Sequence, residues 1–146
     1  MTKRIVTLIL AAIVLLSFAG CKKSGLYPDL PWDAISFDIG EYSPMPGIYY
    51  SSIKWGERTY IPYGKLSREL QEGDLTDCLG YTKYNNEEDK NSRVFTLKGD
   101  NDHNYLIIIH VDNSAYIPAV YRALDTKDKE VKTPDFIEST DRVFWK

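Results

Sequence analysis

The chain predicts a mainly β fold, with α+β as the alternative: a single small antiparallel meander sheet or an open barrel, with one short helix. From residue 47 onward, about five to seven short apolar or alternating segments are separated by turn residues such as Gly, Asn and Asp. No helical segments alternate with them, as parallel βαβ units would require. Without its first 20 residues the chain keeps 126 of 146, enough for one domain with its own core.

The expected strands follow the alternation along the chain. They lie at residues 48–55, 58–63, 76–84, 93–98, 105–111 and 116–122. The first two flank Gly56-Glu57 and form a hairpin. The segment 105–111 is apolar on both faces apart from His110, which is typical of a central strand buried on both sides. Pro118 places the last strand at an edge or a bulge, because proline has no N–H for the ladder.

The remaining segments are expected to form one helix, two loops and a packed C-terminus. Residues 65–71 favour a short helix, because two leucines four apart share one face and a glycine follows. Residues 85–92 and 125–132 are polar or charged and predict solvated loops. The apolar residues near the C-terminus are expected to pack back onto the sheet: Phe136, Ile137, Val143, Phe144 and Trp145.

The N-terminus has the three parts of a secretory signal. Lys3 and Arg4 supply positive charge, residues 5–16 are apolar apart from Thr7, and small residues precede Cys21. The apolar stretch is shorter than the roughly 20 residues of a membrane-spanning helix. A spanning anchor is therefore the weaker interpretation, and residues 1–20 are expected to be removed.

Residues 18–21 (Phe-Ala-Gly-Cys) resemble the lipobox of bacterial lipoproteins, although Phe18 stands where that box usually has Leu. The resemblance implies that Cys21 becomes the N-terminus and carries lipid, palmitate included. Two or more acyl chains anchor a protein firmly. The domain is then expected in the cell envelope outside the cytoplasm: at the outer membrane of a Gram-negative cell, or on the outer face of the cell membrane of a Gram-positive one.

Residues 21–46 join the lipidated cysteine to a Pro/Gly-rich segment that predicts a tether. Such segments are extended and semi-rigid. The alternation of Ile35, Phe37 and Ile39 leaves open a short first strand within it. The β-rich globular domain is expected to span residues 47–146.

Charge and cysteine content restrict the partners and the chemistry. After removal of the signal, 16 basic residues face 21 acidic ones and the net charge is −5. This argues against nucleic acid, because phosphate binding requires a basic surface. With Cys21 lipidated, Cys78 is the remaining thiol, and no internal disulfide can form. Its apolar neighbours favour a buried cysteine over a reactive one.

No metal, cofactor or catalytic motif is complete in the sequence. Residues 100–104 (Asp-Asn-Asp-His-Asn) match alternate ligand positions of a calcium loop, but Tyr105 and Val111 replace its glycine and its bidentate glutamate. A polar turn, with side chains bonded to the backbone, is expected instead. His103 and His110 flank a strand and would lie about 20 Å apart if it is extended, too far to share a zinc ion. No G-x-S-x-G turn or phosphate loop is present.

Aromatic residues provide the candidate binding site. The chain has 11 tyrosines and three tryptophans, which are residue types that anchor binding surfaces. Tyr49, Tyr50, Trp55 and Tyr60 crowd the expected first hairpin and are the candidate binding residues; ordinary cross-strand packing is the alternative.

The function expected from these observations is a membrane-tethered, non-enzymatic binding lipoprotein with a protein partner. An immunity or inhibitor protein is one specific form of it. The alternatives are an accessory subunit of an envelope complex and a small envelope hydrolase.

A second resemblance concerns the globular domain. Residues 78–81 (Cys-Leu-Gly-Tyr) and 93–99 (Arg-Val-Phe-Thr-Leu-Lys-Gly) resemble small uncharacterised lipoproteins of bacteria, in which a Gly-Tyr strand pairs with a strand ending in Lys-Gly. The resemblance implies a hairpin between these two segments and adds no functional site.

Overall fold

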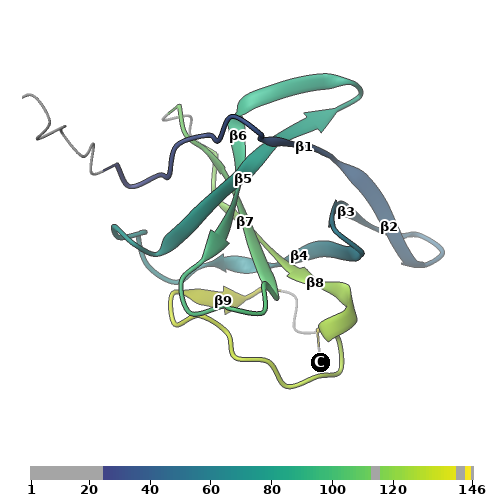
Figure 1. Ribbon diagram of the computed structural model, residues 1–146. Coiled ribbons are helices and arrows are strands. Elements are labelled where there is room, and N and C mark those ends of the chain that lie inside the picture. The colour runs from purple at the N-terminus through teal and green to yellow at the C-terminus, as the bar shows by residue number, and fades with distance from the viewer. Residues whose placement is uncertain (1–24, 113–115, 141–143, 146) are drawn as a thin grey trace, which may run out of the picture.

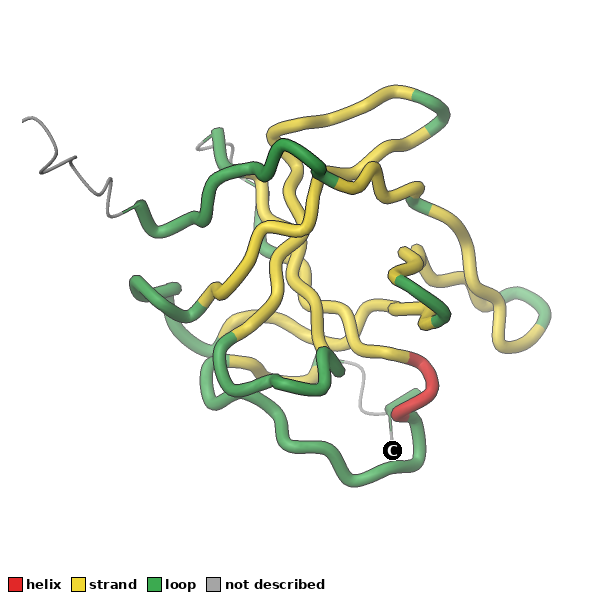
Figure 2. The backbone as a smooth tube through the Cα atoms, viewed as in Figure 1, coloured by secondary structure: helices red, strands yellow, loops and turns green. Residues whose placement is uncertain are grey.

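Nine strands of the computed structural model form one curled, mixed sheet with the shape of a half-barrel (Figures 1 and 2). The structure describes residues 25–112, 116–140 and 144–145. The elements are β1 (Ile35–Asp38), β2 (Gly40–Met45), β3 (Ile48–Trp55), β4 (Arg58–Leu66), β5 (Leu75–Tyr84), β6 (Glu87–Leu97), β7 (Tyr105–His110), β8 (Ala119–Ala123), the 3-10 helix η1 (Leu124–Thr126) and β9 (Ile137–Ser139). The mainly β prediction is confirmed.

The predicted antiparallel meander is only partly present. The sheet order is β1-β5-β6-β7-β8-β4-β3-β2, with β9 beside β4. The runs β2–β3–β4 and β5–β6–β7–β8 are antiparallel meanders, but β1 lies parallel to β5 and β8 returns to β4. The chain passes from β1 directly into β2, so the same segment pairs first with β5 and then with β3. This continuity brings the two ends of the sheet order together and curls the sheet.

The expected tether is shorter than residues 21–46. Residues 35–38 and 40–45 belong to the sheet, and Phe37 is buried in the core. The alternation of Ile35, Phe37 and Ile39 therefore marks a strand, which is the short first strand that the sequence left open. An extended tether can include only residues that precede Ile35; the predicted lipid site Cys21 and residues 1–20 lie outside the described residues.

The core consists of two clusters on the two faces of the sheet. Successive residues of one strand point to opposite faces, so Val94 and Leu106 enter one cluster whereas Phe95 and Ile107 enter the other. All four side chains are fully buried. The prediction that β7 is a central strand buried on both faces is confirmed, since it lies between β6 and β8.

The helix expected at residues 65–71 is wrong. Lys65 and Leu66 extend β4 and pair with Glu138 and Ile137 of β9. A seven-residue helix is too short to be stable without tertiary support, whereas pairing with β9 satisfies the backbone groups. The helical element among the described residues is η1.

The polar loop expected at residues 85–92 is also wrong. Only Asn85 and Asn86 separate the paired residues Tyr84 and Glu87. Both asparagines have a positive φ, as in the two-residue type I′ turn that suits the twist of a hairpin. The strands β5 and β6 thus continue through polar residues to the tip of a long hairpin. The implied pairing of residues 78–81 with 93–99 is confirmed by the register of these strands.

The C-terminal part of the chain packs onto the sheet, as predicted for its aromatic and aliphatic residues. Phe136 and Ile137 are buried in the core. Trp145 donates its indole N–H to the carbonyl of Pro62 at 2.9 Å, and its ring lies edge-on to the ring of Tyr63. Val143 lies outside the described residues.

Candidate functional site

An aromatic groove lies on the hairpin formed by β2 and β3, and we call it the hairpin groove. Its volume is about 420 Å³, and it is lined by Tyr42, Pro44, Met45, Ile48, Tyr50, Lys127 and Phe144. Tyr42 and Tyr50 are cross-strand partners, so their side chains share one face of the hairpin. Gly47, with a φ of 86°, forms the turn that brings the two strands together. The hairpin therefore supplies the floor of the groove.

The far wall of the groove comes from segments that are distant in sequence. The ring of Phe144 lies 5.2 Å from the ring of Tyr50 and 6.4 Å from that of Tyr42. The ammonium group of Lys127 lies 5.0 Å from the Phe144 ring centroid, within cation–π range. The groove is thus apolar and aromatic, with one cation at its rim.

The chemistry of this lining suits binding. The described lining residues include no carboxylate, thiol or imidazole, and the groups among them that could transfer a proton are the tyrosine hydroxyls and the ammonium of Lys127. Met45 and Ile48 are 56 % and 39 % exposed. Exposed apolar side chains beside aromatic rings form the type of surface that anchors a partner.

The four aromatic residues proposed from the sequence do not form one site. Tyr50 lines the groove, and the neighbouring Tyr49 is 62 % exposed. Trp55 lies at the other end of β3 with its ring 5.0 Å from the imidazole of His103. Tyr60 is fully buried and donates its hydroxyl to the carbonyl of His103 at 2.8 Å. Cross-strand packing therefore describes Tyr60, whereas binding by Tyr49, Tyr50 and the half-buried Trp55 stays a prediction.

The remaining groove residues were missed by sequence reasoning. Tyr42, Pro44 and Met45 fall in the segment interpreted as a tether. Tyr42 and Pro44 alternate with Glu41 and Ser43, but this is a weak strand signal because one of the two is a proline and Pro46 follows. Nothing in the sequence places Lys127 and Phe144 beside this hairpin.

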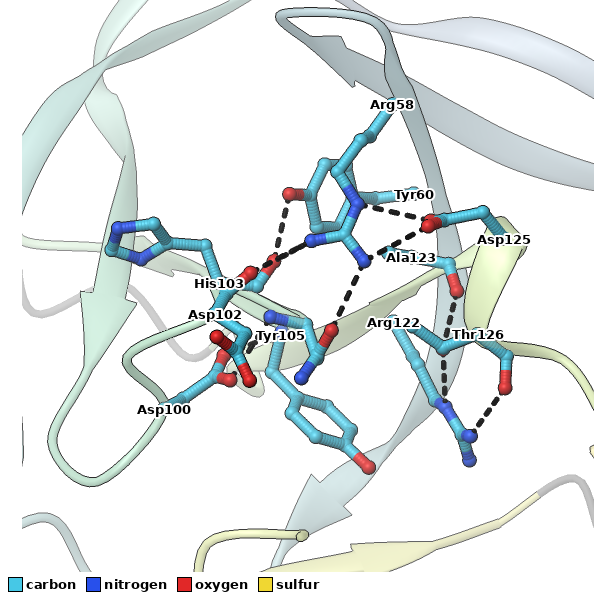
Figure 3. A network of polar contacts seen from close by, with 11 residues as sticks. Arg58, Tyr60, Asp100, Asp102, His103, Tyr105, Arg122, Ala123, Asp125 and Thr126 are labelled. Atoms are coloured by element: carbon cyan, nitrogen blue, oxygen red, sulfur yellow. Dashed lines mark hydrogen bonds and ion pairs between the residues drawn. The ribbon is translucent and has the colours of Figure 1, made fainter. Parts of the chain in front are cut away.

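A second cluster of functional-looking side chains is centred on Arg58 at the start of β4 (Figure 3). Its guanidinium binds both carboxylate oxygens of Asp125, at 2.9 and 3.3 Å. It also donates to the carbonyls of Asp102 and His103, at 2.8 and 2.9 Å, and to the side-chain oxygen of Asn104 at 3.0 Å. Arg58 thus joins three segments: the β3–β4 hairpin, the turn before β7 and η1.

The turn before β7 is held by Asp100. Its carboxylate accepts the backbone N–H groups of Asn104 and Tyr105, at 3.0 and 2.7 Å. Burial raises the pKa of Asp100, and the two backbone hydrogen bonds oppose that shift. The prediction of a polar turn at residues 100–104 with side chains bonded to the backbone is confirmed.

Most polar groups of this cluster are occupied by structural contacts, although the buried Nδ1 of His103 has no hydrogen-bond partner. Every nitrogen of the Arg58 guanidinium has a partner, and both oxygens of Asp100 accept backbone groups. Arg122 is similarly held, by the hydroxyl and the carbonyl of Thr126. The network therefore fixes loops, and the charged groups of Arg58 and Asp100 are engaged within the fold.

The other side chains that could be reactive, His110 and Cys78, are also in contact with neighbouring residues of the fold. His110 stacks on Tyr116 with ring centroids 4.3 Å apart, and its Nδ1 lies 3.7 Å from a carboxylate oxygen of Asp89. Cys78 is buried, as predicted, and burial raises the pKa of its thiol, which disfavours the thiolate. Over the part of the chain that the structure describes, no three His, Cys, Asp or Glu side chains gather in a way that could hold a metal ion.

Within residues 25–112, 116–140 and 144–145, no helix has the length and hydrophobicity that crossing a membrane requires.

Comparison of the chain with protein-family models, with curated proteins and with solved structures produced no match. The features that bear on function are therefore the geometry of the hairpin groove and the sequence of the N-terminus.

Proposed function

We propose that the protein is a membrane-tethered, non-enzymatic binding lipoprotein of the cell envelope, which holds a protein partner in the hairpin groove. The observation that carries this proposal is the groove itself, in which aromatic rings, a methionine and an isoleucine surround about 420 Å³ of open space. The lipobox-like residues before Cys21 support the tether.

The groove has the composition of a protein-binding surface. Aromatic side chains bury a large area at a low cost in conformational entropy and dominate the affinity of protein interfaces. Met45 adds a flexible, polarisable side chain that adapts to the shape of a partner. Lys127 at the rim favours a partner that presents an acidic or aromatic group there.

The specific role that we favour is that of an immunity or inhibitor protein. Such a protein intercepts a toxin or a hydrolase at the cell surface, which requires a tether and a binding face. An accessory subunit of an envelope complex is the alternative that also uses the groove, with a permanent partner instead of an incoming one.

An enzymatic role is the third candidate, and the described side chains give it less support. An active site requires convergent polar groups in a concave pocket, with at least one group free to act on a substrate. The densest polar cluster, around Arg58, is bonded internally, and the hairpin groove is lined by apolar and aromatic residues apart from Lys127. A small hydrolase would therefore need a site that neither cluster supplies.

The test is a comparison of full-length variants, each used as bait for proteins of detergent-solubilised envelopes and culture supernatant. Met45→Asp and Ile48→Asp place a carboxylate in the groove at exposed positions that need not disturb the core. Tyr84→Asp is the control, because Tyr84 is also an exposed apolar residue but lies at the tip of the β5–β6 hairpin.

We expect the wild type and Tyr84→Asp to retain one protein in stoichiometric amount. Both groove variants should weaken that complex by about tenfold or more, since an apolar contact would then bury an unpaired charge. The purified pair should show the same order of affinities by calorimetry. Equal binding by all four proteins would refute the groove as the site, and turnover of a substrate by the purified protein would favour the enzyme.

A further inference from the structure

Three of the most exposed large apolar side chains lie close to the N-terminal end of the domain. Trp32 is 97 % exposed, Ile117 82 % and Tyr116 68 %. Tyr116 and Ile117 immediately precede Pro118, which lines one pocket together with Leu26 and Tyr27. The connection that leads into β8 therefore lies beside the N-terminal segment, and Trp32 belongs to the continuation of that segment toward β1.

The N-terminal segment is fixed to the sheet. The ring of Tyr27 lies 6.1 Å from the ring of Phe95, and Tyr27 and Leu30 pack against the core cluster that contains Phe95. An anchor attached to this segment therefore restrains the position of the whole domain.

The distance from the lipid site is short. Cys21 precedes Gly25 by four residues, and an extended chain spans at most about 3.6 Å per residue. A lipid on Cys21 would thus hold Gly25 within roughly 15 Å of the lipid surface. That is less than the width of a small domain, so the anchor would keep the part of the domain around Gly25 next to the lipid surface.

We infer that this end of the domain docks on the phospholipid surface, with Trp32, Tyr116 and Ile117 in the interfacial layer. The inference depends on the lipid anchor of the proposed function and adds an orientation to it. Tryptophan and tyrosine prefer the boundary between head groups and acyl chains, because one part of each ring is apolar and another part is polar. An exposed isoleucine beside them adds apolar area to the same contact.

Docking in this orientation directs the hairpin groove away from the membrane. In Figure 1 the N-terminal segment, in purple, and the β2–β3 hairpin lie on opposite sides of the sheet. The groove would then be open to a partner that arrives from outside the lipid layer.

The experiment uses the full-length protein, purified from membranes and reconstituted into phosphatidylcholine vesicles with or without brominated acyl chains. Bromine quenches tryptophan fluorescence only at short range. We expect quenching in the wild type and loss of most of it in Trp32→Phe, because Trp55 and Trp145 contact other rings of the domain. Ile117→Asp should reduce the quenching of Trp32 by repelling the docked face, whereas Met45→Asp, in the hairpin groove, should leave it unchanged.

The mass of the N-terminal peptide reports the anchor separately. A peptide without lipid would refute the anchor, and the docking with it. A lipidated, vesicle-bound protein in which Trp32→Phe is quenched as strongly as the wild type, or in which neither is quenched, would overturn the docking alone. If a second copy or a protein partner covers Trp32, neither protein is quenched, and the docking is overturned in that case too.

Discussion

A methyl group at position 80 should detach β1 from the sheet. Gly80 pairs with Ile35 across the parallel strands β1 and β5. A Cβ atom on Gly80 would lie 1.9 Å from the carbonyl oxygen of Ile35 and 2.7 Å from its carbonyl carbon and its amide nitrogen. Ordinary contact begins at 3.4 Å, so the backbone of β1 would have to retreat by roughly 1.5 Å, which the hydrogen bonds of the ladder do not tolerate.

The magnitude follows from what β1 buries. Phe37 is 2 % exposed, and full burial of a phenylalanine side chain contributes about 1.5–3 kcal/mol. Each hydrogen bond between β1 and β5 adds about 1 kcal/mol, net of its replacement by hydrogen bonds to water. We therefore expect Gly80→Ala to lower the free energy of unfolding by at least about 3 kcal/mol.

The assay is urea unfolding followed by tryptophan fluorescence, together with amide hydrogen exchange at Phe37. Gly40→Ala is the matched control, because the nearest atom to its added Cβ is the rotatable Oγ of Ser52 at 3.2 Å. The control should change stability by less than about 1 kcal/mol. If Gly80→Ala unfolds like the control and Phe37 stays protected, the reasoning from the close approach of the two backbones is refuted.

Two further predictions concern charged side chains. The hydrogen bonds from Arg68, at 2.6 and 3.1 Å, hold the pKa of Asp74 below its usual range. The ionised carboxylate therefore stabilises the fold at any pH above the ordinary aspartate pKa. This stabilisation is lost as the pH falls through the pKa of Asp74 in the folded state. Asp74→Asn should therefore lower the Tm at neutral pH by an amount that shrinks in acid; a difference in Tm that stays constant with pH would contradict this. Arg58→Met keeps the side-chain stem but removes the donors that hold the turn before β7, and we expect a loss of about 2 kcal/mol in urea unfolding, with Arg58→Lys intermediate. An unchanged midpoint for Arg58→Met would show that the network around Arg58 does not stabilise the fold.

The strands that the sequence predicts correctly are those in which the hydropathy pattern and the flanking turn residues are sufficient to mark a strand. β7 is apolar at nearly every position, and β3 and β4 meet at a two-residue turn after Trp55. In these cases the local composition and the final environment agree, and the prediction holds.

The errors occurred where pairing partners decide the conformation. Leu66 is strand because Ile137, more than 60 residues later, pairs with it. The polar end of the β5–β6 hairpin is strand because Asn85 and Asn86 make a tight turn and Glu87 pairs with Tyr84. A polar sequence predicts a loop when its register is unknown, since no hydrophobic period marks it.

Gly80 illustrates the same distinction at a single position. Within the sequence it is a glycine that weakens an expected strand. In the fold it is the position at which the backbone of β1 approaches β5 too closely for any Cβ atom. The requirement for glycine comes from the parallel neighbour, and local patterning does not reveal that neighbour.

By itself, the sequence of this protein determined the mainly β class, the central strand β7, the polar turn held by Asp100 and the burial of Cys78, because each depends on residues within a few positions of one another. Only the tertiary structure decided that residues 35–45 close the curled sheet, that Tyr60 belongs to the core, and that Phe144 and Lys127 complete a groove with Tyr42 and Tyr50. The physical reason is that a β-sheet is built from hydrogen bonds between distant segments, so the neighbours of a side chain follow from strand order and register, which a single sequence does not encode locally.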